Sequence, residues 1–344
     1  MRPLQPVVLP ANQPRNRFYA GGTQITALRD GPAAAAVEHT PEDWVASVVP
    51  LFGEDEVGLT RLPSGELLRD AVAADPVGWL GPEHVESFGA DPHLLVKLLD
   101  AGQRLPVHAH PDRGWAARHL GLDHGKTEAW VFLEPAVVHL GFSRDVSADE
   151  LARWVAEQDV SALLSTTHRL QARAGDAVLV PAGLPHAIGE GALLVELQEP
   201  SDLSVLVEWD GFAIDGAAAG HLGLGFETAL TAVDRRGLAR DAVEGLVQSD
   251  ATALGPLLPG AGAFFRADRV RGGGGGAHGW EAGFAVVVAV AGAGQLATAT
   301  GAEVRLERGS TVLVPHAAGP VTVEGDVELV VCRPPSPARQ HHVE

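Results

Sequence analysis

Two histidines, His108 and His110, stand two residues apart in the stretch LPVHAHPDRG, residues 105 to 114. In an extended strand, side chains at this spacing project from one face, about 7 Å apart along the backbone. Pro106 and Pro111 argue against a helix here. The spacing therefore lets two imidazoles bind one metal ion, although such a pair taken alone can also be two ordinary surface or turn histidines.

A third histidine, His186, lies in the stretch GDAVLVPAGLPHAIG, which has the pattern G-x5-P-x-G-x2-H. The earlier stretch has the pattern G-x5-H-x-H, beginning at Gly102. These are the two sequence motifs of the cupin superfamily, in the expected order. The glycines permit tight turns between strands, and histidines of both motifs can converge on one ion inside a barrel. The glutamate that usually follows H-x-H closely is absent, and Glu128 in GKTEAW comes later.

The displaced glutamate makes the chain resemble one cupin family in particular. The stretches LLVKLLDAGQRLPVHAHPD, GKTEAW and GDAVLVPAGLPHAIG look like type I mannose-6-phosphate isomerases, zinc-dependent enzymes with two cupin domains. EDWVAS and the C-terminal region are similar more faintly. The resemblance implies four metal ligands, His108 in the place of the family's glutamine, His110, Glu128 and His186. Three imidazoles and a carboxylate suit one divalent ion, with zinc first and iron, manganese or nickel as alternatives.

The implied reaction interconverts mannose 6-phosphate and fructose 6-phosphate through a cis-enediol, with the metal as Lewis acid. Lys126 stands two residues from Glu128 and can serve as a proton carrier or contact substrate oxygens. Lys97 lies near the sugar site in the resembling family. Only two of the 25 basic residues are lysines. Each can also be a solvated surface charge, but we take Lys126, Lys97 and Arg113 as candidate catalytic residues.

One departure from the family leaves the substrate open. The family's catalytic arginine should follow the stretch ELQEPSD, but the chain has Leu206 or Val207 there. Candidates for its replacement are Arg113 and Arg144, and a phosphate site could be formed by Arg104, Arg113, Lys126 and Arg144. The alternatives are an isomerase of a free sugar, a noncatalytic sugar-binding or regulatory cupin and, more remotely, an iron oxygenase. Glu196 can lie beside the site or face solvent, and we favour solvent.

An internal repeat predicts the architecture. RAGDAVLVPAGLPHAIG, from Arg173, and ERGSTVLVPHAAGPVTV, from Glu307, align without a gap, and Pro320 stands opposite His186. We expect a mostly β fold of two tandem cupin, jelly-roll type barrels with several added helices. Residues 1–215 would form the metal-binding domain and residues 216–344 a degenerate domain without metal ligands. The stretch SADELARWVAEQDVSALL, residues 147 to 164, is predicted as a helix with a capping box.

The amino-acid composition limits the classes of molecule that we expect the chain to bind. The 344-residue chain has 44 acidic and 25 basic residues, a net charge of -19 and no Lys/Arg-rich block, which argues against nucleic acid and anionic membranes. The single cysteine, Cys332, excludes an intramolecular disulfide and a cysteine-based zinc site. Neither a signal peptide nor a membrane span is found, which predicts a cytoplasmic protein. We expect a small-molecule sugar or sugar phosphate as ligand, and a monomer or homodimer.

Overall fold

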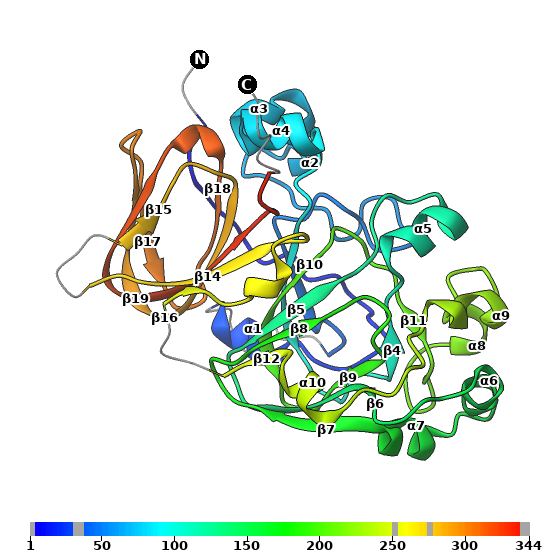
Figure 1. Ribbon diagram of the computed structural model, residues 1–344. Helices are drawn as coiled ribbons and strands as arrows, with labels where there is room; N and C mark the ends of the chain where they lie inside the picture. Colours follow the sequence, from blue (N-terminus) through cyan, green and yellow to red (C-terminus); the bar gives the residue numbers. More distant parts are fainter. Residues whose placement is uncertain (1–3, 30–37, 250–253, 274–277, 338–344) are drawn as a thin grey trace, which may run out of the picture.

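The computed structural model describes residues 4–29, 38–249, 254–273 and 278–337. Its strands form three sheets in which neighbouring strands are antiparallel, so the prediction of a mostly β fold is confirmed (Figure 1). The finer prediction of two jelly-roll barrels in tandem stays a prediction. Within the described part of the chain, we find no helix with the length and apolar character needed to cross a membrane.

Two of the sheets form the part of the fold that holds the predicted site. The six-stranded sheet has the order β12 (Val247–Gln248), β8 (Ala177–Val180), β5 (Glu128–Phe132), β10 (Leu193–Gln198), β3 (Leu95–Asp100) and β2 (Glu42–Val45). The five-stranded sheet has the order β11 (Val205–Leu206), β4 (His108–Ala109), β9 (His186–Ile188), β6 (Ala136–Phe142) and β7 (Thr167–Ala172).

The central strands β5, β10 and β3 are buried on both faces, which explains why most of their residues are apolar. Leu99, Trp130 and Leu194 belong to a cluster with Leu140 and Ile188 of the five-stranded sheet, so this face lies between the two sheets. Alternate residues point the other way, because successive side chains of a strand face opposite sides. These residues, which include Val96, Val131 and Val195, pack with apolar side chains of the C-terminal sheet.

The C-terminal sheet is built around two long strands, β16 (Ala285–Thr298) and β19 (Val321–Arg333), which pair with each other. The remaining strands are β1 (Val7–Val8), β13 (Gly255–Pro256), β14 (Arg266–Arg271), β15 (His278–Trp280), β17 (Glu303–Glu307) and β18 (Thr311–Val314). β1 pairs with β18, and β12 pairs with β8, so strand pairing crosses the predicted 215/216 boundary twice. That division stays a prediction.

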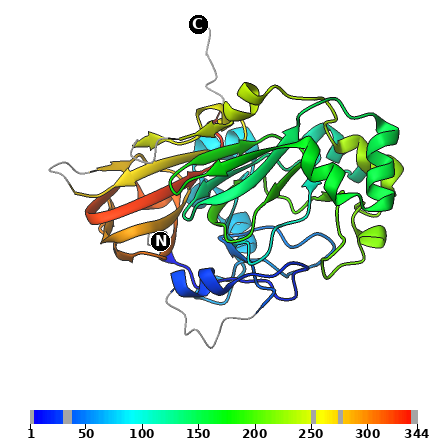
Figure 2. The ribbon, with the colours of Figure 1, turned by 90° about the horizontal axis from the view of Figure 1, so that it is seen from below.

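The outer face of the five-stranded sheet, opposite the C-terminal sheet, is covered by helices that include α5 (Arg113–Leu120), α6 (Ala148–Glu157), α7 (Val160–Thr166) and α9 (Phe226–Ala229) (Figures 1 and 2). The other α-helices are α1 (Thr23–Leu28), α2 (Leu68–Ala74), α3 (Pro76–Leu80), α4 (Pro82–Phe88), α8 (Gly216–Ala219) and α10 (Arg240–Glu244). Of these, α1, α2, α3 and α4 lie elsewhere in the fold. Short 3-10 helices are η2 (Leu230–Ala232), η3 (Pro259–Ala261) and η4 (His316–Ala318).

The helix predicted over residues 147 to 164 is two helices. Ser147 caps α6 as expected, since its Oγ accepts a hydrogen bond from the Glu150 backbone N–H at 3.1 Å. The run then breaks at Gln158, which has a φ of 50°, and the Asp159 side chain caps α7 through the Ala162 N–H. The side-chain amide of Gln158 accounts for the break, because its Oε1 accepts hydrogen bonds from the backbone of Trp209 and Asp210.

Candidate metal centre and cavity

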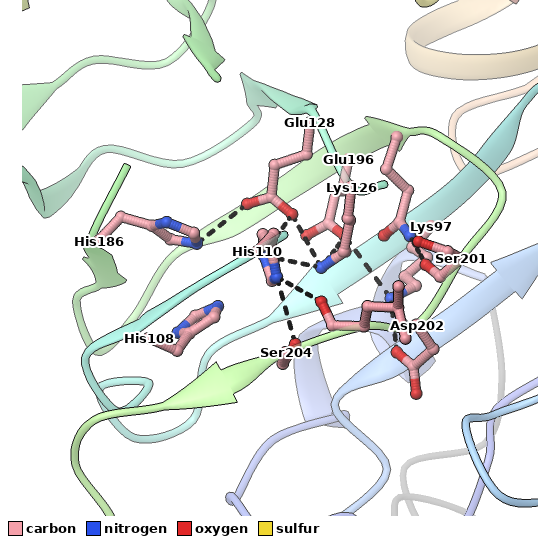
Figure 3. A network of polar contacts seen from close by, with 12 residues as sticks. Lys97, His108, His110, Lys126, Glu128, His186, Glu196, Ser201, Asp202 and Ser204 are labelled. Carbon is pink, nitrogen blue, oxygen red and sulfur yellow. Dashed lines mark hydrogen bonds and ion pairs between the residues drawn. The ribbon is translucent and has the colours of Figure 1, made fainter. Parts of the chain in front are cut away.

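Three histidines come together from the two cupin motifs. His108 in β4 and His186 in β9 are direct partners in the five-stranded sheet, and His110 follows β4 by one residue. The ring centroids of His108 and His186 are 4.2 Å apart, and His110 lies 4.9 Å from each. One ring nitrogen of each histidine lies within 4.8 Å of the others, and all three side chains are buried. Figure 3 shows the three side chains beside Glu128.

Backbone carbonyls orient the three rings. Nδ1 of His108, His110 and His186 lies 2.8, 2.7 and 2.8 Å from the carbonyl oxygens of Pro106, Leu203 and Leu184. A carbonyl oxygen only accepts, so each Nδ1 carries the proton and donates it. The unprotonated nitrogen in each neutral ring is then Nε2. This arrangement is the one by which proteins fix the tautomer of metal-binding histidines.

Glu128 reaches the histidines from the facing sheet. Its position in β5 places one carboxylate oxygen 3.1 Å from His110 Nε2 and the other 3.2 Å from His186 Nε2. Because Nε2 is unprotonated, these pairs bring lone pairs together. His186 Nε2 is buried without a hydrogen-bond partner, and Glu128 Oε2 accepts no hydrogen bond, although the Lys126 ammonium lies 2.9 Å from it. Buried acceptors that face each other in this way fit a bound cation.

The protonation states of these side chains also fit a bound cation. Burial lowers the pKa of His108 well below its usual range and that of His110 to about 3, where nearby Lys126 adds to the effect. Burial alone raises the pKa of Glu128, but the charge of Lys126 and the histidine contacts outweigh it and hold that pKa well below the usual range. His108 and His110 are therefore neutral and Glu128 is ionised, which are the forms that bind metals.

A cavity of about 210 Å³ lies next to the histidines, bordered by His108 and Glu128. Its polar lining consists of Arg17, Tyr19, Glu42, Lys97, Lys126, Glu196, Asp202 and Ser204. Its apolar lining includes Phe18, Phe52, Leu99, Leu105, Ile188, Leu206, Ile214 and Leu222. A lining of apolar side chains with several polar groups is typical of small-molecule sites.

Both lysines line this cavity and are buried, so neither is a solvated surface charge. Lys126 Nζ lies 2.9 Å from Glu128 Oε2, 3.0 Å from His110 Nε2 and 3.8 Å from Glu196 (Figure 3). Lys97 Nζ lies 3.5 to 3.7 Å from carboxylates of Glu42, Glu196 and Asp202. Burial alone lowers the pKa of Lys97, but these carboxylates raise it above its usual value, so Lys97 stays charged.

Glu196 is buried, and the favoured expectation that it faces solvent is wrong. Trp44, Lys97, Glu196 and Trp130 are successive cross-strand partners on β2, β3, β10 and β5. Directly paired residues of antiparallel strands share a face. Burial raises the pKa of Glu196 to about 6, and the charge of Glu128 acts in the same direction.

The sequence did not predict the cluster of buried polar side chains around Glu42. The Glu42 carboxylate accepts hydrogen bonds from the Tyr19 hydroxyl and, at 2.6 Å, from the Trp44 indole N–H, and it lies 3.2 Å from Arg17. The alternation in EDWV places Glu42 and Trp44 on one strand face. This alternation could have indicated that Glu42 and Trp44 share a strand face, but it does not show that this face is buried.

Of the arginines predicted to act at the site, none borders the cavity. Arg113 in α5 pairs with Glu199 and lies over the ring of Phe264, 4.9 Å from its centroid. Arg144 pairs with Glu150 at the surface, and Arg104 pairs with Glu208. Each guanidinium group is thus paired with a carboxylate that does not line the cavity. Of the four residues proposed to gather positive charge there, only Lys126 lines it.

Curated relatives are found over parts of the chain, whereas no model of a known protein family matches it. A mannose-6-phosphate isomerase of Streptococcus mutans is 37% identical over 139 residues, which cover 38% of this chain and 42% of that protein. A Bacillus subtilis protein named a probable mannose-6-phosphate isomerase is 31% identical over 201 residues, 56% of this chain and 58% of that protein. The matches thus span about half the length of these relatives.

Solved structures match nearly the whole chain. The mannose 6-phosphate isomerase of Bacillus subtilis superposes with a TM-score of 0.69 at 23% identity, covering 96% of this chain and 100% of that structure. A mutant phosphomannose isomerase of Salmonella typhimurium gives a TM-score of 0.71 at 15% identity, with coverage of 96% and 100%. The chain therefore has the fold of these proteins, and its sequence relatives are named mannose-6-phosphate isomerases.

Proposed function

We propose that the chain is a metal-dependent aldose–ketose isomerase that interconverts mannose 6-phosphate and fructose 6-phosphate. The observation that carries this proposal is the convergence of three histidines and Glu128 at a cavity that also contains two buried lysines. The names of the relatives support the same reaction class.

The metal ligands would be Nε2 of His108, His110 and His186 and the carboxylate of Glu128. The unprotonated nitrogens and buried carboxylate described above support this assignment. Zinc suits such a set, and iron, manganese and nickel remain alternatives. The ion would supply Lewis acidity, which stabilises negative charge on sugar oxygens during proton transfer between C1 and C2.

The lysines would handle protons and orient the sugar. Lys126 Nζ borders the cavity and can donate a hydrogen bond to a substrate oxygen or carry a proton. Glu196 lies between Lys126 and Lys97, within 3.8 Å of the first ammonium and 3.6 Å of the second. One buried carboxylate thereby holds both ammonium groups close together. Both lysines can then contact a bound sugar from the same side.

Arg113 would act as a positioning residue. Its partner Glu199 also accepts a hydrogen bond from the Thr127 backbone N–H at 2.8 Å through its second carboxylate oxygen. Thr127 lies between Lys126 and Glu128 in the chain. The Arg113–Glu199 pair therefore fixes the backbone that carries two residues of the site, without touching the cavity itself.

Isomerisation of a free, non-phosphorylated hexose is the second candidate. Leu206, one of the two residues expected where the resembling family has its catalytic arginine, lines the cavity. Each cation that borders the cavity already has a carboxylate partner. A phosphate dianion needs positive charge close by. A neutral sugar needs no positive charge. The apolar side chain of Leu206 therefore favours a free sugar over a phosphorylated one.

Parallel assays distinguish these readings. The zinc-loaded chain is incubated with mannose 6-phosphate and, separately, with D-mannose, and ketose formation is measured before and after chelator treatment. Turnover of the first supports the main proposal, and turnover of only the second supports the free-sugar candidate. Sugar binding without turnover would favour a noncatalytic regulatory role. The cytoplasmic location and the monomeric or homodimeric state remain part of the proposal.

A further inference from the structure

A second cluster of metal-ligating side chains lies outside the cavity. Asp91 and His93 belong to the segment between α4 and β3, and His124 belongs to the segment between α5 and β5. One potential ligand atom of each residue lies within 4.8 Å of the others. The His93 and His124 rings are 4.7 Å apart at 86°, and His124 Nε2 lies 2.6 Å from Asp91 Oδ2. None of the three residues borders the cavity described above.

The two histidines have unused nitrogens. Nδ1 of His93 and Nδ1 of His124 are buried without a hydrogen-bond partner. Buried polar atoms normally find a partner, so two orphaned imidazole nitrogens in one cluster indicate a ligand. Burial also lowers the pKa of His93 to about 4, which leaves this imidazole neutral and able to bind a cation near neutral pH.

The local backbone is arranged around these side chains. His93 has a φ of 52°, an uncommon conformation for a residue other than glycine, and its N–H donates to Asp91 Oδ1 at 2.7 Å. The Asp91 carbonyl accepts a hydrogen bond from His84 Nε2 at 2.6 Å. These contacts turn the His93 ring toward His124. The nearby cation Arg113 is neutralised by Glu199.

We propose that Asp91, His93 and His124 form a second binding site for a divalent transition-metal ion of the zinc, cobalt and nickel class. Nδ1 of His93 and Nδ1 of His124 would bind the ion together with water, and the Asp91 carboxylate, which lies 2.6 Å from His124 Nε2, would orient that ring through its other nitrogen. The His124 and Asp91 side chains are 12% and 39% exposed, so an ion can enter from solvent. The ion would link the segment before β3 to the segment that leads into Lys126, and its role would be structural.

The test uses zinc stoichiometry in a chain whose first site is disabled. His186→Ala removes a proposed ligand of the cavity site, and the metal-stripped variant is then incubated with Zn²⁺, gel-filtered and subjected to elemental analysis. We expect about one zinc per chain in His186→Ala and none after His93→Asn and His124→Asn are added. Asparagine tolerates the left-handed conformation of residue 93. His119→Asn, on α5, is the matched control and should leave the zinc content unchanged.

Thermal unfolding provides a second readout. Zinc that binds only the folded state raises the melting temperature, so Zn²⁺ should stabilise His186→Ala by several degrees but not the triple variant. If the triple variant misfolds, His124→Asn alone in the His186→Ala background replaces it with the same expectation. A zinc content near zero in folded His186→Ala, or an equal content in the folded triple variant, would overturn the proposal. Neither result depends on isomerase activity.

Discussion

Leu206 lies directly opposite His108 in the antiparallel pair of β11 and β4, so both side chains share the sheet face that borders the cavity. On the other side, His108 pairs with His186. This pairing therefore places an apolar residue beside two proposed metal ligands.

Leu206→Arg should shift specificity toward phosphorylated sugars. A guanidinium group beside the site can form charge-assisted hydrogen bonds with a phosphate, worth about 1.5 to 3 kcal/mol. We therefore expect the ratio of kcat/KM for mannose 6-phosphate to that for D-mannose to rise about 10-fold to 100-fold. Leu206→Met, which keeps volume and polarity, is the control. An unchanged ratio in folded Leu206→Arg would mean that the phosphate lies elsewhere.

His186→Ala should abolish tight metal retention at the cavity site. The variant loses one of three imidazoles and leaves the Glu128 carboxylate with one histidine contact fewer. Metal titration followed by isothermal calorimetry should show the loss of the tightest binding step. His139→Ala provides the control, since His139 lies on β6 of the same sheet and does not line the cavity. Unchanged binding in His186→Ala would remove His186 from the site.

Lys126→Met should lower kcat by about 100-fold or more, the usual cost of losing a proton-transferring group. Lys126→Arg is the informative comparison, because arginine keeps a positive charge near Glu128 but does not lose its proton in proteins. If Lys126 carries a proton, kcat stays low in the arginine variant while metal content stays normal. Recovery of kcat with arginine would instead assign Lys126 a purely electrostatic role.

Glu196→Gln should change how stability depends on pH. Burial raises the pKa of Glu196 to about 6 from an ordinary value of 4.5, so the folded state binds this proton more tightly than the unfolded state. The resulting contribution favours folding below about pH 4.5 and is lost as the pH rises through about 6, which corresponds to roughly 2 kcal/mol. Urea unfolding of the metal-free wild type and of the variant, at pH 4.5 and pH 7, measures this contribution to the free energy of unfolding.

The free energy of unfolding of the wild type, relative to that of Glu196→Gln, should therefore fall by roughly 2 kcal/mol between these two pH values. Glu190→Gln replaces an exposed glutamate and should produce no such difference. A relative stability of wild type and Glu196→Gln that does not vary with pH would show that Glu196 titrates at its ordinary pKa in the folded chain.

The sequence predicts the proposed ligands better than their surroundings. His108, His110 and His186 belong to motifs with fixed local spacing, and Lys126 shares a stretch with Glu128. The buried network of Arg17, Glu42, Lys97 and Asp202 draws on four segments, which are brought together by strand pairing and loop packing. No local pattern encodes such pairings. For the same reason, Arg113 could be suspected of acting at the site, since nothing near it in the sequence indicates its partner Glu199.

The most direct test of the central claim is hydrogen exchange at the reacting carbons. The zinc-loaded chain is incubated with mannose 6-phosphate and with D-mannose in D2O, and 13C and proton NMR follow ketose formation and deuterium at C1 and C2. We predict ketose formation with at least one of these sugars, together with deuterium incorporation, and loss of both in His186→Ala. A folded chain with its zinc bound that neither isomerises nor exchanges hydrogen on either sugar would contradict the account.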